Sequence, residues 1–153
     1  MPVLKALGDE IRKNGSLKDI RISMALHTEA KTGILALTLA RAGAKVRLTS
    51  CNPLSTDDDI VEALNATDEL EVNAKYGQSR DDYYRSLNWA LDQKPQIVID
   101  DGGDLVRLLH SERRDLLDDV LGGCEETTTG IIRLKALQKE GRLMFPMTDM
   151  NNC

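Results

Sequence analysis

The sequence has few aromatic residues, few cysteines and no excess of basic residues. Aromatic residues make up only 3% of its 153 residues, which is too few for a surface that stacks nucleic-acid bases. The net charge of 20 − 25 = −5 argues against a basic nucleic-acid interface. The cysteines, Cys51, Cys124 and Cys153, lie far apart, which argues against a zinc ribbon and a disulfide framework.

No stretch of the chain has the pattern of a membrane span or of a secretory signal. No apolar run approaches the ~18 residues that a membrane-spanning helix needs. Asp9 and Glu10 come too early for a secretory signal. We therefore expect a cytoplasmic protein that binds neither membranes nor nucleic acid. The 41% hydrophobic and 29% charged residues are typical of one globular domain.

Strand-like and helix-like segments alternate along the chain. The expected strands are residues 20–26, 45–51, 70–74, 95–101 and 143–147. The expected helices are residues 3–13, 30–41, 55–65, 81–92, 105–121 (with an interruption near Ser111) and 131–139. This alternation predicts an α/β fold, a three-layer sandwich with a mostly parallel, Rossmann-like or flavodoxin-like sheet and helices on both faces.

Polar residues gather where the predicted strands end. Ligands in such folds bind beyond the carboxyl ends of the strands. Four junctions have this character: residues 27–32 (HTEAKT), 51–55 (CNPLS), 100–104 (DDGGD) and 125–130 (EETTTG). Together they offer a histidine, carboxylates, a lysine and hydroxyls. The chain contains no GxGxxG, P-loop or HExxH motif.

Each of these residues also has a structural interpretation. His27 is at a strand end, where histidines are often structural, and residues 100–103 form a turn signature. The hydroxyls of residues 127–129 are able to cap a helix. Asp100 and Asp101, however, end an apolar strand, where a buried carboxylate needs a partner or a function. Three further features are interpreted structurally: residues 57–59 as helix N-terminal charge, His110 as a packing or surface histidine, and Cys124 as an inert turn residue.

The residues at these junctions resemble a known family. The matching stretches are Ala25–His27, Ser50–Thr56, Ile99–Leu105 and Glu125–Gly130. They are similar to the substrate-binding domain of the adenosylhomocysteinase family, the hydrolases of S-adenosyl-L-homocysteine. Residues 81–84 and 113–117 are similar to its archaeal branch. The resemblance runs almost end to end, and the order and spacing of EETTTG and DDGGD are highly specific.

The resemblance implies a reaction and the roles of several residues. In the family, tightly bound NAD oxidises the ribose 3′-hydroxyl, homocysteine leaves from C5′ by elimination, water adds, and NADH reduces the ketone. His27 and Asp101 match the acid–base pair near C5′, and Glu126 matches a carboxylate that binds the ribose hydroxyls. Cys51 and Asn52 match residues that line the site. The residues that match hydroxyls reaching NAD are Thr127, Thr128 and Thr129. No metal is implied.

The resemblance also implies a domain organisation. Residues 1–153 match the substrate-binding domain, whereas the NAD-binding domain with its GxGxxG motif, and the family's lysine and aspartate that serve the 3′-oxygen and C4′, are absent. We therefore expect a piece of a longer enzyme, inactive by itself. We expect the intact enzyme to be a homo-oligomer, a tetramer or a dimer, with NAD bound mainly by the other domain.

One departure bears on the substrate. Many family members have threonine two residues after the histidine, where this chain has Glu29. The stretch from Met24 through Lys31 to Thr32 is similar to a methanogen branch associated with S-inosyl-L-homocysteine, and we assign Glu29, Lys31 and Thr32 to substrate binding. A carboxylate accepts the N1 hydrogen of hypoxanthine, whereas N1 of adenine is itself an acceptor. In the structural alternative, Glu29 caps the following helix or pairs with Lys31.

Two other functions stay open at this point. One is a stand-alone module that binds a nucleoside without catalysis. The other is a flavodoxin-like regulatory domain that uses Asp100, Asp101 and a metal ion.

Overall fold

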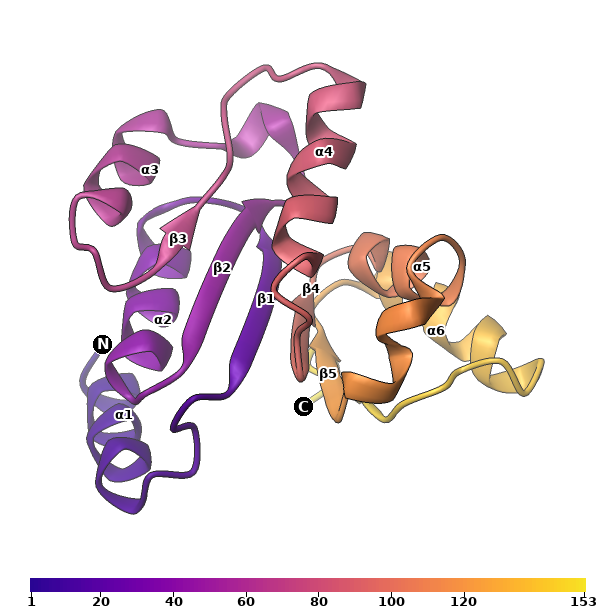
Figure 1. Cartoon of the computed structure of the whole chain (residues 1–153), viewed down its shortest axis with the longest axis horizontal. Helices are drawn as coiled ribbons and strands as arrows, with labels where there is room; N and C mark the ends of the chain where they lie inside the picture. The colour runs from indigo at the N-terminus through magenta and orange to yellow at the C-terminus, as the bar shows by residue number, and fades with distance from the viewer.

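The computed structural model describes residues 1–153 and contains one six-stranded sheet (Figure 1). The strands are β1 (Arg21–Leu26), β2 (Lys45–Ser50), β3 (Glu71–Val72), β4 (Ile97–Asp100), β5 (Gly122–Glu125) and β6 (Met147–Asp149). Their order across the sheet is β3-β2-β1-β4-β5-β6, and every neighbouring pair is parallel. The predicted α/β fold with a parallel sheet is therefore confirmed.

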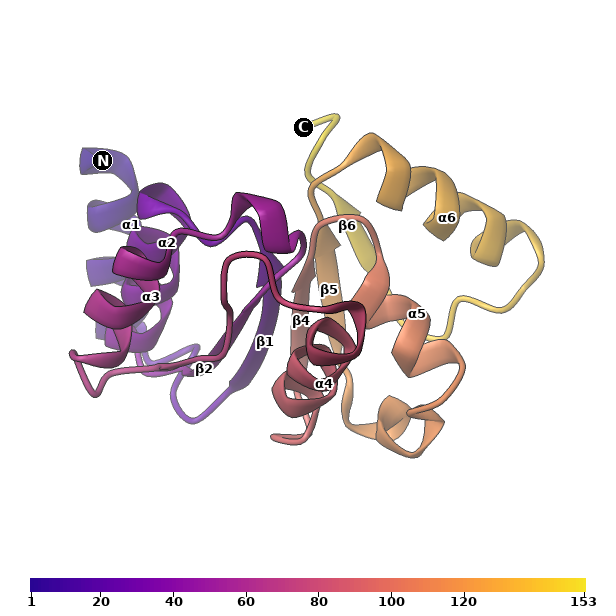
Figure 2. The same ribbon diagram turned by 90° about the horizontal axis from the view of Figure 1, so that it is seen from above.

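Helices cover the two faces of this sheet. The α-helices are α1 (Pro2–Asn14), α2 (Ala30–Arg41), α3 (Asp58–Asn65), α4 (Arg80–Leu91), α5 (Asp104–His110) and α6 (Thr128–Lys139), and two 3₁₀ helices are η1 (Pro53–Ser55) and η2 (Arg114–Asp119). Figure 2 shows α1, α2 and α3 on one side of the sheet and α4, α5 and α6 on the other. No helix is long and apolar enough to cross a membrane.

The alternation of side chains along the strands divides the core into two clusters. On β1, Ile22 and Met24 face α2 and α3, whereas Ala25 belongs to the cluster under α4, α5 and α6. On β4, Val98 faces the second cluster. Successive side chains of a strand point to opposite faces, so these short apolar runs supply both cores at once.

The fifth strand was not predicted from the sequence. Gly122 and Gly123 favour a turn, yet they form β5 between β4 and β6, so the interpretation of Cys124 as a turn residue is wrong. A Cβ atom on Gly123 would lie 2.6 Å from Val98 and 2.7 Å from Met147. The absence of a side chain is what lets the three strands pack at this point.

The other differences concern element ends. The strand expected at 143–147 is wrong in position, because β6 begins at Met147 and Phe145 packs into the core before it.

The expected interruption near Ser111 is confirmed, since α5 ends at His110 and the chain continues as η2. His110 is confirmed as a packing histidine: it is buried, and its Nε2 accepts the N–H of Met144.

The strand order places a topological switch between β1 and β4. From β1 the chain moves through α2 to β2, and from β4 it moves through α5 to β5 on the other side. The connections therefore leave β1 and β4 in opposite directions. Ligands in open parallel sheets bind at such a point. His27 follows β1 and Asp101 follows β4, so both lie at this position.

The tight packing of α6 predicts the effect of a single methyl group. A Cβ atom on Gly130 would overlap the carboxylate of Glu125, whereas a Cβ atom on Gly33 of α2 would meet Leu64 at an ordinary 3.4 Å. Gly130→Ala should lower the free energy of unfolding by ~1–3 kcal/mol. Gly33→Ala should leave it unchanged or raise it by up to ~1 kcal/mol. Urea denaturation measures both, and equal effects would contradict the packing described.

Candidate functional site

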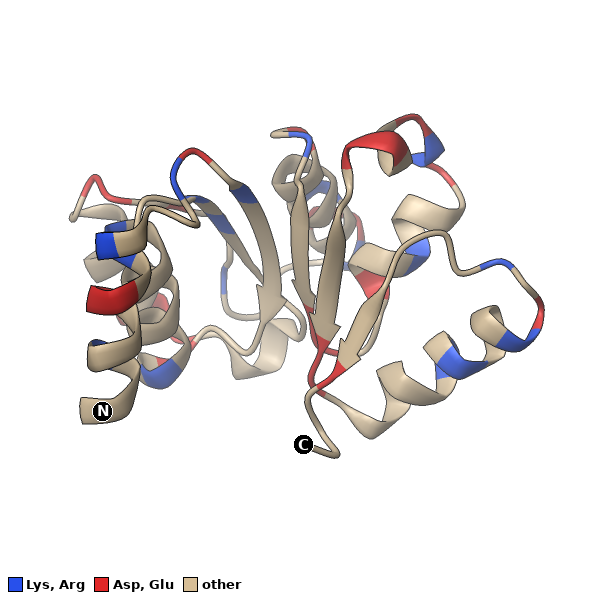
Figure 3. Cartoon of the chain, turned by 90° about the horizontal axis from the view of Figure 1, so that it is seen from below, with Lys and Arg blue, Asp and Glu red and all other residues tan.

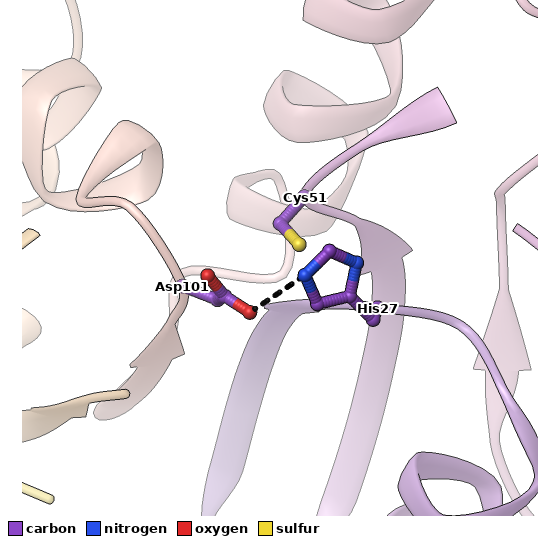
Figure 4. Close-up of side chains that lie close together, drawn as sticks. All are labelled: His27, Cys51 and Asp101. Atoms are coloured by element: carbon purple, nitrogen blue, oxygen red, sulfur yellow. Dashed lines mark ion pairs between the residues drawn. The ribbon is translucent and has the colours of Figure 1, made fainter. Parts of the chain in front are cut away.

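Three candidate side chains meet at the carboxyl ends of three neighbouring strands (Figure 4). Leu26 pairs in register with Ser50, and Ala25 with Asp100. His27 and Cys51 therefore leave the sheet at the same level, and Asp101 is level with Leu26, one residue earlier on β1. One ligand atom from each side chain lies within 4.8 Å of the other two. The predicted meeting of these junctions at one rim is confirmed for these three residues.

The turn after β2 fixes the orientation of the His27 ring. Nδ1 of His27 contacts the hydroxyl of Ser55, which donates its hydrogen to the carbonyl oxygen of Asn52 at 3.0 Å. Because that hydroxyl hydrogen is used, Ser55 accepts from Nδ1–H. A neutral His27 then carries its lone pair on Nε2. The turn itself is held by the hydroxyl of Thr56, which donates to Ser50 Oγ at 2.8 Å.

His27 and Asp101 form a pair that is able to share a proton. Nε2 of His27 lies 3.4 Å from Oδ2 of Asp101, and the side chains are 48% and 7% exposed, respectively. Burial raises the pKa of the Asp101 carboxyl, and the charge of the nearby His27 partly offsets that rise. One partner is open to a ligand and the other is held by the protein. This arrangement suits an acid–base pair.

Cys51 stays a thiol in this environment. Burial raises the pKa of the Cys51 thiol well above its usual range, and the neighbouring Asp101 carboxylate and its hydrogen bond raise it further. The Tyr83 hydroxyl donates to the Cys51 carbonyl oxygen at 3.1 Å. A nucleophilic cysteine needs a lowered thiol pKa, so this environment does not activate Cys51 for attack on a substrate.

Two buried carboxylates hold the loop that carries Asp101. Asp100 on β4 and Glu125 on β5 are in register and are fully buried. The oxygens of Asp100 accept the N–H groups of Asp101 at 3.2 Å and Val106 at 2.9 Å. Oε1 of Glu125 accepts the N–H of Gly102 at 2.8 Å. These bonds replace the water that a carboxylate would otherwise need, and they fix the turn after β4.

Glu125 also fixes the start of α6. Its Oε1 accepts from both the N–H and the hydroxyl of Thr127 at 2.9 Å, while that hydroxyl caps α6 by accepting from Gly130 N–H. Oε2 of Glu125 is buried without a hydrogen-bond partner. Sequence reasoning missed Glu125, because its role depends on β5 being a strand beside β4.

The comparisons with known proteins identify the family. Residues 1–120 match the family model described as S-adenosyl-L-homocysteine hydrolase. The chain belongs to this family. It is 53% identical over 152 residues to a protein named S-inosyl-L-homocysteine hydrolase from Methanocaldococcus jannaschii. It is 49% identical over 152 residues to one named adenosylhomocysteinase from Thermoplasma volcanium. The alignments cover 99% of this chain and 36% and 37% of those relatives, respectively.

A solved structure supports the fold of this family member. A crystal structure titled as an NADH-dependent reductase, A1-R′, responsible for alginate metabolism matches with a TM-score of 0.50 and 13% identity. The match covers 86% of this chain and 75% of that one. At this identity the likeness concerns the α/β architecture alone.

The remaining residues that the family resemblance assigned lie along the same edge of the sheet. Glu126 is exposed, and its backbone N–H donates to the carbonyl oxygen of Asp100 at 3.0 Å. Asn52 is exposed and caps η1. At the start of α2, Glu29 and Thr32 are half-buried, and their neighbour Lys31 is exposed. At the start of α6, the hydroxyl of Thr127 is used as a cap, and Thr128 and Thr129 are exposed.

The buried carboxyl of Asp100 predicts a pH dependence of stability. Burial raises the pKa of Asp100 from 3.8 to about 8. The folded protein therefore holds a proton that the unfolded chain releases, so stability falls as pH rises from about 4 to about 8. In Asp100→Asn this part of the slope should disappear, although the melting temperature falls because a hydrogen bond is lost.

The test is the melting temperature of the chain between pH 5.5 and 8.5. Asp118→Asn is the matched control, since Asp118 is exposed, and it should keep the wild-type slope. An equal slope in Asp100→Asn and wild type would show that Asp100 is ionised throughout.

Proposed function

We propose that residues 1–153 form the substrate-binding domain of a hydrolase that cleaves S-adenosyl- or S-inosyl-L-homocysteine to homocysteine and the nucleoside. The observation that carries the proposal is the His27–Asp101 pair, with Nε2 3.4 Å from Oδ2 at the switch between β1 and β4. The family membership supports the same reaction. A nucleoside thioether fits a small polar site at this position better than a macromolecule does.

The pair suits proton transfer at the C5′ side of the substrate. A thioether is a poor target for direct hydrolysis, and its sulfur leaves more easily when an acid supplies a proton. The proton shared by His27 Nε2 and Asp101 Oδ2 is available to the departing sulfur. After this transfer the deprotonated pair accepts a proton from the water that adds at C5′. Cys51 stays protonated beside Asp101 and contacts the substrate without reacting.

NAD fits the edge formed by the start of α6. Thr128 and Thr129 are exposed in the first turn of this helix, where backbone N–H groups favour anionic groups. Thr127 acts through the cap that holds this turn. When bound, NAD supplies the oxidation of the ribose 3′-hydroxyl that makes the neighbouring C4′ hydrogen acidic. Glu126, exposed beside Asp101, is placed to accept hydrogen bonds from the ribose hydroxyls.

Glu29 is available to contact the base. It occupies the N-cap position of α2, but its side chain makes no capping hydrogen bond, and no ion pair joins it to Lys31. Neither structural alternative for this carboxylate is therefore supported. Relatives of 53% and 49% identity bear the inosyl and the adenosyl name, so identity alone does not decide the base. We propose that the Glu29 carboxylate accepts a hydrogen bond from N1–H of hypoxanthine.

Asp101→Asn tests the acid–base assignment in the hydrolase that carries this domain. Asparagine keeps the shape but holds no exchangeable acid proton, so kcat should fall by ~10²–10⁴-fold. Binding of the nucleoside thioether to the isolated chain, measured by isothermal titration calorimetry, should change little. An unchanged kcat would remove Asp101 from the chemistry, and Asp118→Asn serves as the exposed control.

Glu29→Thr tests the assignment of the base. The wild-type enzyme should have the higher kcat/KM for S-inosyl-homocysteine, because a charge-assisted bond to N1–H contributes ~1.5–3 kcal/mol. The variant should lower this preference by ~10–100-fold, which is the same energy expressed as a ratio of rates. Glu10→Thr, at an exposed position of α1, is the control and should leave the ratio unchanged. A wild type that prefers the adenosyl substrate, or a ratio that Glu29→Thr leaves unchanged, would refute the assignment.

A further inference from the structure

The three side chains at the switch point have the donor atoms of a metal site. An imidazole nitrogen from His27, a sulfur from Cys51 and a carboxylate oxygen from Asp101 converge from three strands (Figure 4). Imidazole, thiolate and carboxylate are the ligand types that Zn²⁺ takes in proteins. Sites with three protein ligands leave a fourth position open to water or to another ligand.

The spacing of the His27 and Asp101 donor atoms matches two ligands of a tetrahedral zinc ion. Zn–N and Zn–O bonds of about 2.1 Å at a tetrahedral angle put the two ligand atoms about 3.4 Å apart. His27 Nε2 and Asp101 Oδ2 are 3.4 Å apart. All three donor atoms lie within 4.8 Å of one another, compared with about 3.5 Å for a nitrogen and a sulfur on one zinc ion. A movement of about 1 Å by the Cys51 side chain, within the reach of a χ1 adjustment, closes the site.

The surroundings prepare these residues for a cation. Ser55 holds Nδ1 of His27, so the Nε2 lone pair faces Asp101, and ligating histidines bind a partner through their other nitrogen in this way. Acidic segments gather at the arrowheads of the central strands in Figure 3, where Asp100, Asp101, Glu125 and Glu126 lie. The neighbouring Arg133 binds the Gly102 carbonyl oxygen and Asp104, which leaves Asp101 without an arginine partner.

We propose that His27, Cys51 and Asp101 form a Zn²⁺ site with three protein ligands and one open coordination position. Zn²⁺ binds His27 Nε2 and Asp101 Oδ2 in place of the proton that they share. The Cys51 thiol releases its proton to solvent and binds as thiolate. Zn²⁺ therefore inhibits the hydrolase. This consequence rests on the proposed role of the His27–Asp101 pair, whereas the existence of the metal site does not depend on that role.

Cobalt binding to the isolated chain tests the site directly. Co²⁺ replaces Zn²⁺ in such sites and reports a bound thiolate through a charge-transfer absorption band. We expect one equivalent of Co²⁺ to produce this band with tetrahedral visible bands, and one equivalent of Zn²⁺ to abolish them. Cys51→Ser should lose the charge-transfer band and bind Zn²⁺ at least about 100-fold more weakly. Cys124→Ser and Cys153→Ser, whose sulfurs are outside the cluster, should behave as wild type.

Ser55→Ala gives a second variant that keeps all three ligands. It should retain the charge-transfer band and bind Zn²⁺ about 10-fold more weakly, because the His27 ring loses its partner. Circular dichroism verifies that each variant is folded. A folded wild-type chain without the band, or an equal band in Cys51→Ser, would overturn the proposal.

Inhibition is measured separately on the hydrolase. Zn²⁺ should lower kcat/KM, a chelator should restore it, and saturating nucleoside thioether should protect against it. Cobalt binding without inhibition would refute the role of the pair in catalysis and leave the metal site standing. If Zn²⁺ inhibited Cys51→Ser as strongly as it inhibits the wild type, the metal site would be refuted and the proposed function would stand.

Discussion

The in-register pairing of Asp100 on β4 with Glu125 on β5 places two buried carboxylates beneath the switch point. Their oxygens accept N–H groups from the turn at 101–102, from α5 and from the start of α6. A buried carboxylate is unfavourable unless it is bonded or protonated, so these backbone groups are bound to one geometry. The position of Asp101 and the capped turn with Thr128 and Thr129 both depend on this pair.

The parallel sheet converts separate sequence motifs into one site. His27, Cys51 and Asp101 are far apart in sequence, but register makes them neighbours at the carboxyl ends of β1, β2 and β4. The connections diverge between β1 and β4, and the His27 side chain is 48% exposed at this position. One arrangement therefore underlies both proposals, the proton transfer by His27 and Asp101 and the metal site that they form with Cys51.

Much of this organisation follows from the sequence alone. Short apolar runs that end in polar residues predicted β1, β2, β4 and the rim that they form. The sequence did not predict β5, because two glycines favour a turn unless Val98 and Met147 pack against them. The role of Glu125 depends on that strand and was missed with it. The sequence around Thr127 fits both a helix cap and a ligand contact. Only the hydrogen bonds of its hydroxyl with Glu125 and Gly130 show that it serves as the cap.

In the proposed reaction His27 and Asp101 move the proton at C5′, and the family resemblance assigns the C4′ hydrogen to other residues. Single-turnover analysis of a His27→Gln hydrolase in deuterated water separates these steps. The account predicts that deuterium still enters the substrate at C4′ while release of homocysteine slows by ~10²–10⁴-fold. Loss of both processes together, or release at the wild-type rate, would contradict it.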